Sequence, residues 1–240
     1  MVRTWLVMLA VVALVAAAGC GVKDSGKNAE DGGDANAPVE ASHWGAERVV
    51  YAADFEGYWQ HEKTRPGDER WEEPAADREY FKFTFHGDKL TKLETFGQDG
   101  EPLQRLKTGL RVAWRYAAHG GMLEEIGYDE DDEVDELNTR RYDGSGRVIE
   151  ETYGYGSGDV VSKTACTYSG ESTHPDTQTV YDGDGNRLSR STYSYSADGR
   201  ERVVELVMYD SKGKPRGEPQ KSTEYWNAEA AHWGPMIPAE

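Results

Sequence analysis

The sequence predicts an all-β protein, an antiparallel meander of about ten short strands joined by tight Asp/Gly hairpins. The first observation is a series of tyrosines separated by 13, 13, 13, 14 and 14 residues: Tyr142, Tyr155, Tyr168, Tyr181, Tyr195 and Tyr209. The second is a short phrase that four of these tyrosines open, in which Asp or Ser follows and Gly and a basic residue come last. A fixed period this short is typical of one small structural unit copied many times.

Each copy of the phrase has the chemistry of a turn followed by a strand. In Tyr142-Asp143-Gly144-Ser145-Gly146-Arg147, the aspartate can accept bonds from the backbone N–H groups just after it, and the last glycine can take positive φ. These features favour a type I turn closed by a one-residue bulge. Residues 187–195 are rich in Ser, Thr and Tyr and have no helical period, so they predict a strand.

Weaker copies extend the pattern toward the N-terminus. Phe96-Gly97-Gln98-Asp99-Gly100-Glu101 is a good copy, whereas those led by Phe85, Tyr116 and Tyr128 are looser. We therefore expect strands across residues 46–221, in a curved single sheet or a partly closed barrel, because large open sheets curl. Residues 225–231 contain Ala-Glu-Ala-Ala and predict a short C-terminal helix within a tail spanning 222–240.

The phrase resembles a known bacterial repeat. Together with the strand ends Tyr153-Gly154-Tyr155 and Tyr193-Ser194-Tyr195, it resembles the YD repeats of Rhs-type surface proteins, and it is similar to the β-hairpin repeats of MORN-like proteins. The match covers residues 141–216, with weaker support over 81–128. The resemblance implies β-hairpin architecture and a bacterial envelope setting, and it brings no catalytic residues with it.

The N-terminus has the pattern of a targeting segment. Arg3 precedes an apolar run over residues 5–18, which ends in small residues placed against Cys20. This resembles a bacterial lipobox, although Ala17 stands where that family most often has leucine. The resemblance implies a signal peptide over 1–19 and lipidation of Cys20; the alternative is an ordinary secretory signal cut nearby. Gly21, in place of an aspartate, favours the outer membrane over the inner one.

The polar segment after Cys20 predicts a flexible tether over residues 20–45, because it is too poor in large apolar side chains to offset chain entropy. If Cys20 carries lipid, Cys166 is the only other cysteine, so no intramolecular disulfide is expected. We expect Cys166 to be a small buried side chain rather than a catalytic thiol.

The formal net charge of −17 limits the partners, and removal of residues 1–19 takes away only one basic residue, Arg3. Phosphate binding needs a basic surface, so we expect no nucleic-acid partner. The expected partners are the membrane, through the lipid anchor, and a protein, for which a basic surface is the natural complement.

Two acidic segments are candidate cation sites. Asp182, Asp184 and Asn186 are spaced like the start of a calcium loop, although position twelve is Tyr193 rather than glutamate. The run containing Asp129, Asp131 and Asp132 is the densest charge block. Both segments also fit ordinary solvated turns, and we expect no cofactor, with calcium as the one alternative.

Aromatic residues are a further candidate set. The tripeptide His-Trp-Gly occurs at 43–45 and again at 232–234, either as caps on the sheet edges, as a ligand patch or by chance. Trp59, Trp71 and Trp114 suit cross-strand packing and, less well, sugar stacking.

The sequence predicts a non-enzymatic envelope lipoprotein whose β-repeat domain binds or scaffolds an unknown ligand. No Gly-x-Ser-x-Gly, phosphate-loop or His-Glu-x-x-His motif occurs. One alternative, which the resemblance to MORN-like and Rhs-type proteins implies, is an immunity or antitoxin-like protein whose acidic surface binds a basic toxin. Another is an envelope-polymer hydrolase, which needs a pocket with a carboxyl of raised pKa. A lipid carrier needs an apolar concave face, and the polar strands argue against one.

Overall fold

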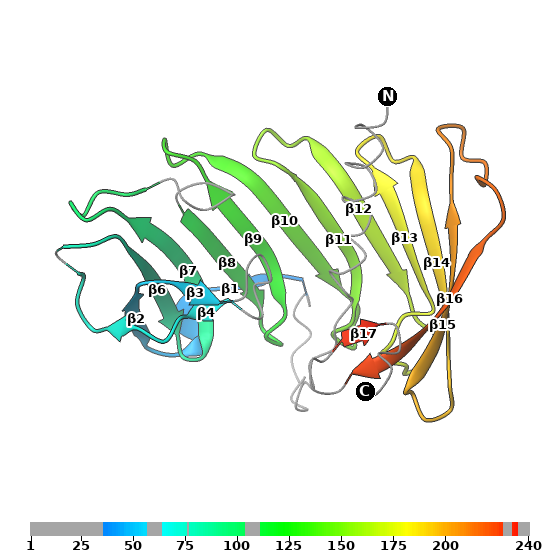
Figure 1. Ribbon diagram of the computed structural model, residues 1–240, viewed down its shortest axis with the longest axis horizontal. Helices are drawn as coiled ribbons and strands as arrows, with labels where there is room; N and C mark the ends of the chain where they lie inside the picture. The colour runs from blue at the N-terminus through cyan, green and yellow to red at the C-terminus, as the bar shows by residue number, and fades with distance from the viewer. Residues whose placement is uncertain (1–35, 57–63, 76, 104–110, 228–231, 235–240) are drawn as a thin grey trace, which may run out of the picture. The chain divides into compact units, whose positions relative to one another are not determined.

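The computed structural model describes residues 36–56, 64–75, 77–103, 111–227 and 232–234. Over these residues the chain is all-β apart from one short 3-10 helix (Figure 1). The chain divides into two compact units.

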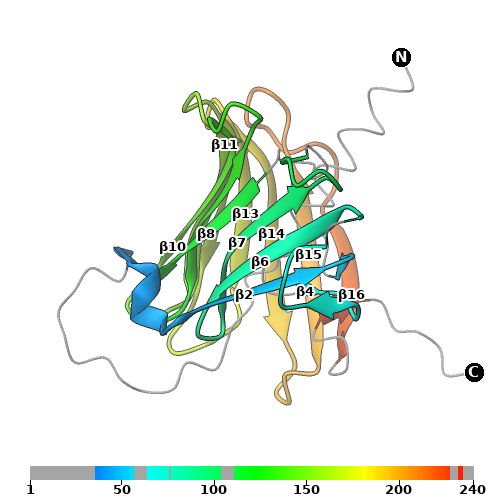
Figure 2. The ribbon, with the colours of Figure 1, turned by 90° about the vertical axis from the view of Figure 1, so that its left-hand side faces the viewer.

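The first unit contains residues 23–146 and 151–161. It holds the 3-10 helix, which precedes strand β2, and a series of strands that lie side by side (Figure 2). Its elements are β1 (Pro38–Val39), η1 (Ala41–Trp44), β2 (Glu47–Ala52), β3 (Phe55–Glu56), β4 (Arg65–Pro66), β5 (Arg70–Trp71), β6 (Tyr80–His86), β7 (Lys89–Phe96), β8 (Arg111–Ala117), β9 (Met122–Tyr128) and β10 (Val134–Tyr142).

The second unit contains residues 147–150 and everything from residue 162 onward that the structure describes. The division between the units passes through β11 (Val148–Tyr155) and β12 (Val160–Thr167). The remaining strands are β13 (Thr177–Asp182), β14 (Arg187–Tyr195), β15 (Glu201–Met208), β16 (Gln220–Asn227) and β17 (His232–Gly234).

The strands follow one another as an antiparallel meander. The hydrogen-bonded order is β17-β16-β15-β14-β13-β12-β11-β10-β9-β8-β7-β6-β2-β5, with β1 paired to β8 and a separate pair β3-β4. Within the described residues, no pairing joins the two ends of this order, β17 and β5. The predicted fold class is confirmed, with more strands in the sheet than the expected ten.

The turn chemistry of the repeat is the predicted one. The carboxylate of Asp143 accepts the Ser145 N–H at 2.9 Å, and Gly146 has a φ of 74° while its N–H bonds the Asp143 carbonyl. The glycines at the same place in other copies also have positive φ: Gly100, Gly185, Gly199 and Gly213. In the copy led by Tyr128, Asp132 takes this place with a φ of 67°, so the turn keeps its shape without glycine.

Three of the repeat tyrosines form hydrogen bonds that reach the neighbouring strand or the residues just before it. The hydroxyls of Tyr142, Tyr168 and Tyr195 each donate to a backbone carbonyl that lies 20 residues earlier. The acceptors are Met122, Val148 and Pro175, at distances of 2.7, 2.8 and 3.0 Å. This recurrent bond explains why the repeat carries tyrosine rather than phenylalanine at these three positions.

Replacing Tyr142 with phenylalanine is expected to lower the free energy of unfolding by about 1 kcal/mol, because the buried Met122 carbonyl loses its hydroxyl donor. Urea unfolding measures the change. Tyr155→Phe is the control, because the Tyr155 side chain is exposed and its loss of a hydroxyl is expected to change little. Equal destabilisation by both changes contradicts a structural role for the repeated hydroxyl.

In two copies of the phrase, the basic residue after the turn lies over a later repeat tyrosine. The guanidinium of Arg147 lies 4.7 Å from the centroid of the Tyr168 ring, and that of Arg187 lies 5.0 Å from Tyr209. Such cation–π contacts contribute about 0.5–1 kcal/mol at exposed sites. In the copies that make these contacts, the aromatic and basic residues of the phrase join neighbouring parts of the sheet.

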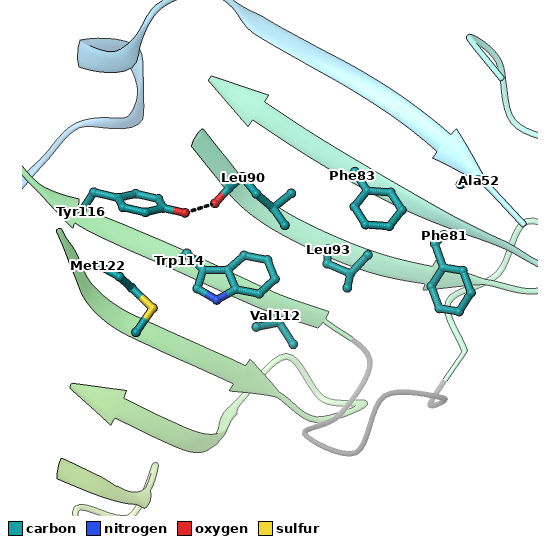
Figure 3. Packing of buried hydrophobic residues seen from close by; sticks show 9 residues of the cluster. All are labelled: Ala52, Phe81, Phe83, Leu90, Leu93, Val112, Trp114, Tyr116 and Met122. Atoms are coloured by element: carbon teal, nitrogen blue, oxygen red, sulfur yellow. Dashed lines mark hydrogen bonds between the residues drawn. The ribbon is translucent and has the colours of Figure 1, made fainter. Parts of the chain in front are cut away.

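The hydrophobic core lies in the first unit. Nine buried side chains pack together there: Ala52, Phe81, Phe83, Leu90, Leu93, Val112, Trp114, Tyr116 and Met122 (Figure 3). Phe83 and Ala52 are fully buried, and Phe55 of β3 packs edge-to-face on Phe81 with ring centroids 5.0 Å apart. The Tyr116 hydroxyl bonds the Leu90 carbonyl within the cluster. Among the described residues, the first unit buries one polar side chain, Thr95, whereas the second unit buries five: Ser162, Thr164, Gln178, Thr179 and Ser189.

The structure corrects two boundaries. The predicted flexible tether was extended to residue 45, but β1 pairs with β8, and the Asn36 side chain bonds both backbone groups of Tyr142. The predicted C-terminal helix was placed from residue 225, but Tyr225 and Trp226 belong to β16, where cross-strand pairing with β15 and β17 overrides the local preference. The rest of that predicted helix, residues 228–231, lies outside the described residues.

Candidate functional site

The candidate site is a polar network in the first unit, where the core gives way to charged side chains. Glu125 of β9 lies directly opposite Trp114 of β8 on one side and Asn138 of β10 on the other. The Trp114 Nε1–H donates to Glu125 Oε2 at 2.7 Å, and the Asn138 Nδ2–H donates to Oε1 at 3.3 Å. Both carboxylate oxygens are thus held by neighbouring strands.

The environment of Glu125 favours its neutral form. Burial raises the pKa of the Glu125 carboxyl, and the nearby Glu151 carboxylate raises it further. The hydrogen bonds from Trp114 and Asn138 and the positive charge of Arg140 act in the opposite direction, but burial is the largest cause. Burial therefore keeps the Glu125 carboxyl protonated to a higher pH than an exposed glutamate.

The network continues across β10 and β11. Arg140 Nε donates to Glu151 Oε1 at 3.0 Å, and both side chains are mostly buried. Next to this pair, burial and a hydrogen bond with Glu136 raise the pKa of the Tyr153 hydroxyl. The Tyr153 ring lies 6.1 Å from that of Tyr155, which is exposed.

Both oxygens of Glu125 are engaged by donors within the sheet. A general acid or base needs an oxygen that can reach the reacting group, whereas both oxygens of Glu125 already accept bonds. A depression of about 480 Å³ does occur in the first unit, but it is lined by residues of the segment 71–78 and not by Glu125. The contacts of the network join neighbouring strands of the sheet.

The raised pKa of Glu125 gives the stability a pH dependence of defined sign. The folded state holds this proton more tightly than the unfolded state, so the stabilisation is complete at low pH. It is lost as the pH rises through the raised pKa of the folded protein. Glu125→Gln is expected to remove this decline and to be more stable than the wild type at neutral pH.

Urea unfolding measured from pH 4 to pH 8 tests this expectation. Glu124→Gln is the matched control, because Glu124 is the next residue, faces the other side of β9 and pairs with Arg115 at 3.1 Å. The control should keep the pH profile of the wild type. A Glu125→Gln profile that parallels the wild type contradicts the assignment.

The two predicted cation sites are turns whose carboxylates bind backbone and side-chain donors. Asp182 accepts the Asn186 N–H at 2.8 Å and the Asn186 side-chain amide at 3.1 Å, and these bonds lower the pKa of the Asp182 carboxyl. Asp184 is an exposed member of the same turn. Among the residues that the structure describes, no group of three or more His, Cys, Asp or Glu side chains is placed to hold a metal ion.

The acidic run has the same kind of turn. The Asp129 carboxylate accepts the N–H groups of Asp131 and Glu133, and Asp132 forms an ion pair with Arg111 at 2.9 Å. The guanidinium of Arg111 also lies 4.0 Å from the centroid of the Tyr128 ring. The acidic run from Asp129 to Glu133 thus forms the turn between β9 and β10.

The structure overturns the expectation of a lone Cys166. Cys166 is buried and disulfide-bonded. The only other cysteine in the sequence, Cys20, lies outside the described residues. The expectation that no intramolecular disulfide forms depends on a lipid at Cys20, which would take away the second cysteine that a disulfide needs.

The aromatic candidates have different surroundings. Trp44 of the first His-Trp-Gly copy packs edge-to-face on Tyr116, with centroids 6.2 Å apart, so it covers the core rather than a sheet edge. The second copy, 232–234, is the terminal strand β17 itself. Trp114 is a core residue, Trp71 lines the depression beneath Arg78, and Trp59 lies outside the described residues.

Sequence reasoning missed Glu125. The signal was present, because Glu124 and Glu125 stand between Leu123 and Ile126 in a predicted strand, and adjacent residues of a strand point to opposite faces. One of the two glutamates must therefore face inward. The abundance of carboxylates elsewhere in the chain concealed it.

The described part of the chain contains no helix of the length and apolarity that crossing a membrane requires. Comparison with protein-family models and with curated proteins gives no match. Function is therefore argued from the residues and their geometry.

Proposed function

We propose that this chain is a membrane-anchored bacterial envelope lipoprotein whose β-repeat domain is a non-enzymatic binding or scaffolding module. The anchor is a lipid on Cys20, and the outer membrane is its proposed location. The single observation that carries the anchor is the apolar run over residues 5–18 that ends in small residues against Cys20. Two or more acyl chains, as a lipobox cysteine carries, give stable membrane attachment.

The binding role is supported by what the described residues do. The repeated Tyr, Asp, Gly and Arg residues are used by turns and cross-strand contacts, as Asp143, Gly146 and Arg147 illustrate. The most distinctive polar network, around Glu125, has both of its carboxylate oxygens held by donors. Oxygens occupied in this way argue against acid–base chemistry by Glu125, so the proposal gives the domain a non-catalytic role.

The anchor has a chemical consequence for Cys166. A thioether to lipid occupies the sulfur of Cys20, so the anchored form cannot also join Cys20 to Cys166 in a disulfide. The anchored form is therefore the one in which Cys166 is a thiol. The disulfide-bonded form belongs to a chain without the lipid.

Membrane fractionation of a Cys20→Ser variant tests the proposal. The wild type should sediment with membranes, incorporate labelled palmitate and accumulate as a precursor when signal peptidase II is inhibited with globomycin. Cys20→Ser should lose both the label and the membrane association, whereas the control Cys166→Ser should keep them. If Cys20→Ser still associates with membranes, the proposed lipid anchor on Cys20 is contradicted.

A further inference from the structure

The depression in the first unit is a candidate ligand site that is separate from the network around Glu125. It has a volume of about 480 Å³. Small-molecule sites in proteins have volumes of about 300–1,000 Å³, so a small ligand fits a depression of this size. The lining residues all belong to the short segment 71–78. We call this feature the Trp71 depression.

The segment that lines the depression is held at both ends. At its start, Trp71 of β5 pairs with Tyr51 of β2, and the Ala53 N–H bonds the Glu69 carbonyl at 3.2 Å. At its end, the Arg78 guanidinium forms an ion pair with Glu69 at 2.8 Å. This ion pair joins residues that are nine positions apart and so closes the loop. The walls of the depression are therefore held by backbone pairing and by a closing ion pair.

An aromatic ring faces the depression. The Trp71 side chain is half-buried, and the guanidinium of Arg78 lies 5.5 Å from the centroid of its ring. Because Arg78 also lines the depression, the ring face beneath it is turned toward the lining. Tryptophan attracts cations more strongly than the other aromatic side chains do, at distances up to about 6 Å. The ring thus already has one cation of the chain itself near the outer limit of such a contact.

Two carboxylates beside the ring carry unbalanced negative charge. Glu72 and Glu73 line the depression, and both are exposed. Neither has an ion pair or a hydrogen bond with any residue in the described part of the chain. The positive charge of Arg78 is already paired with Glu69 and lies 3.6 Å from Asp77. The lining therefore has an excess of negative charge, which favours a positively charged ligand.

The rest of the lining is apolar and suits methyl groups. Pro74 and Ala75 stand between the carboxylates and Arg78 along the segment. A primary ammonium group has three N–H donors that need acceptors, whereas a quaternary ammonium ion has none and packs its methyl groups on apolar and aromatic surface. Binding of quaternary ammonium groups by aromatic side chains is a recurrent use of the cation–π contact.

We propose that the Trp71 depression binds a quaternary ammonium ion. The methyl groups lie on the part of the Trp71 ring that Arg78 leaves uncovered, and the carboxylates of Glu72 and Glu73 balance the charge. This inference names a ligand class for the proposed binding role and rests on that proposal. It makes no use of the lipid anchor, so the two can fail separately.

Isothermal titration calorimetry of the full mature chain, in a detergent without choline groups, tests the inference. The probe is choline, and the comparison is its uncharged isostere, in which a carbon atom replaces the nitrogen (dimethylbutanol). Choline should bind with a dissociation constant of about 1 mM or tighter, and the isostere should bind at least about tenfold more weakly. Choline binding should weaken as salt screens the carboxylates.

Variants of the lining locate the site. Trp71→Phe should weaken choline binding about threefold and Trp71→Leu about tenfold, because the attraction for cations falls from tryptophan to phenylalanine and is absent in leucine. The double change Glu72→Gln with Glu73→Gln should weaken it about tenfold. Both glutamates are exposed, so this double change keeps the fold even if a change at Trp71 disturbs β5.

The controls make the same changes in the second unit. Trp226→Leu removes another tryptophan, which is 39% exposed, and Glu171→Gln with Glu218→Gln removes two other exposed carboxylates. Each control should change choline binding by about twofold or less.

Vesicles of phosphatidylcholine identify the source of the ammonium group. They are added to the chain without its lipid, the Cys20→Ser variant. Co-sedimentation that Trp71→Leu abolishes assigns the ligand to a lipid headgroup, whereas binding of free choline without co-sedimentation assigns it to a soluble ion.

Three outcomes would overturn the inference. One is the absence of choline binding at low salt, or equal binding of choline and its isostere. Another is choline binding that is unchanged in Trp71→Leu. The third is an equal loss in the site and control glutamate pairs, which indicates attraction to net charge alone. Membrane fractionation of the same variants reports on the anchor and should be unchanged in all those that keep Cys20.

Discussion

Replacing Phe83 with alanine is expected to lower the free energy of unfolding of the first unit by about 3–5 kcal/mol. Phe83 has an exposed fraction of 0% and packs in the centre of the core cluster with Leu93 and Trp114 as fellow members. Truncation removes the buried ring and leaves a cavity that the rigid strands on either side fill only in part. Urea unfolding followed by tryptophan emission measures the loss, because Trp114 lies in the same cluster.

Phe85→Ala is the matched control for this change. Phe85 is two residues further along β6 and its ring lies 6.5 Å from that of Phe83, but it is only partly buried and carries the Arg48 guanidinium on its face. Its replacement should cost clearly less. If the two changes cost the same, the core is not centred where the structure places it.

Replacing Gly156 with alanine is expected to cost about 1–3 kcal/mol or more, through a backbone clash. A Cβ at this position overlaps the Val134 carbonyl oxygen and approaches the Val134 Cβ. Neither group is the end of a flexible side chain, so β10 and the β11–β12 turn must move apart. The Gly156 N–H bond to Asp135 is expected to be lost in the process. Thermal unfolding measures the loss.

Gly144→Ala separates this clash from the general effect of replacing a turn glycine. Gly144 lies in the β10–β11 turn, and a Cβ there meets nothing within 4 Å. We expect this control to change stability by about 0.5 kcal/mol or less. A Gly156→Ala variant as stable as Gly144→Ala would contradict the close approach of Gly156, in the β11–β12 turn, to Val134 at the start of β10.

The sequence predicted the turns because their chemistry is local. Asp143 bonds an N–H two residues away, and Gly146 bonds the carbonyl of Asp143. All the donors and acceptors of such a turn belong to a few consecutive residues. The same holds for the strands between the turns, whose composition excludes a helical period.

The roles of the tyrosines and of Glu125 were harder to predict because their partners are distant in the sequence. The Tyr142 hydroxyl bonds a carbonyl 20 residues earlier, and Glu125 is held by Trp114 and Asn138 from two other strands. Register across the sheet decides these contacts. The β8–β9 and β9–β10 pairs both contain bulges, which local sequence does not locate.

Two errors in the sequence reading have the same origin. The polar composition of residues 38–44 predicts a tether, yet β1 lies within this segment and is stabilised by pairing with β8. The predicted helix at 225 likewise ignored the neighbours of β16. In both cases, cross-strand pairing outweighs the preference of a short segment.

Mass spectrometry of the protein extracted from bacterial membranes, with alkylation of thiols before digestion, tests the central claim most directly. The account predicts that the anchored chain begins at Cys20, which carries a diacylglyceryl group. It also predicts that Cys166 is recovered in its alkylated form, as a thiol. A chain with unmodified Cys20, or with Cys20 and Cys166 recovered as one disulfide-linked species, would contradict the account.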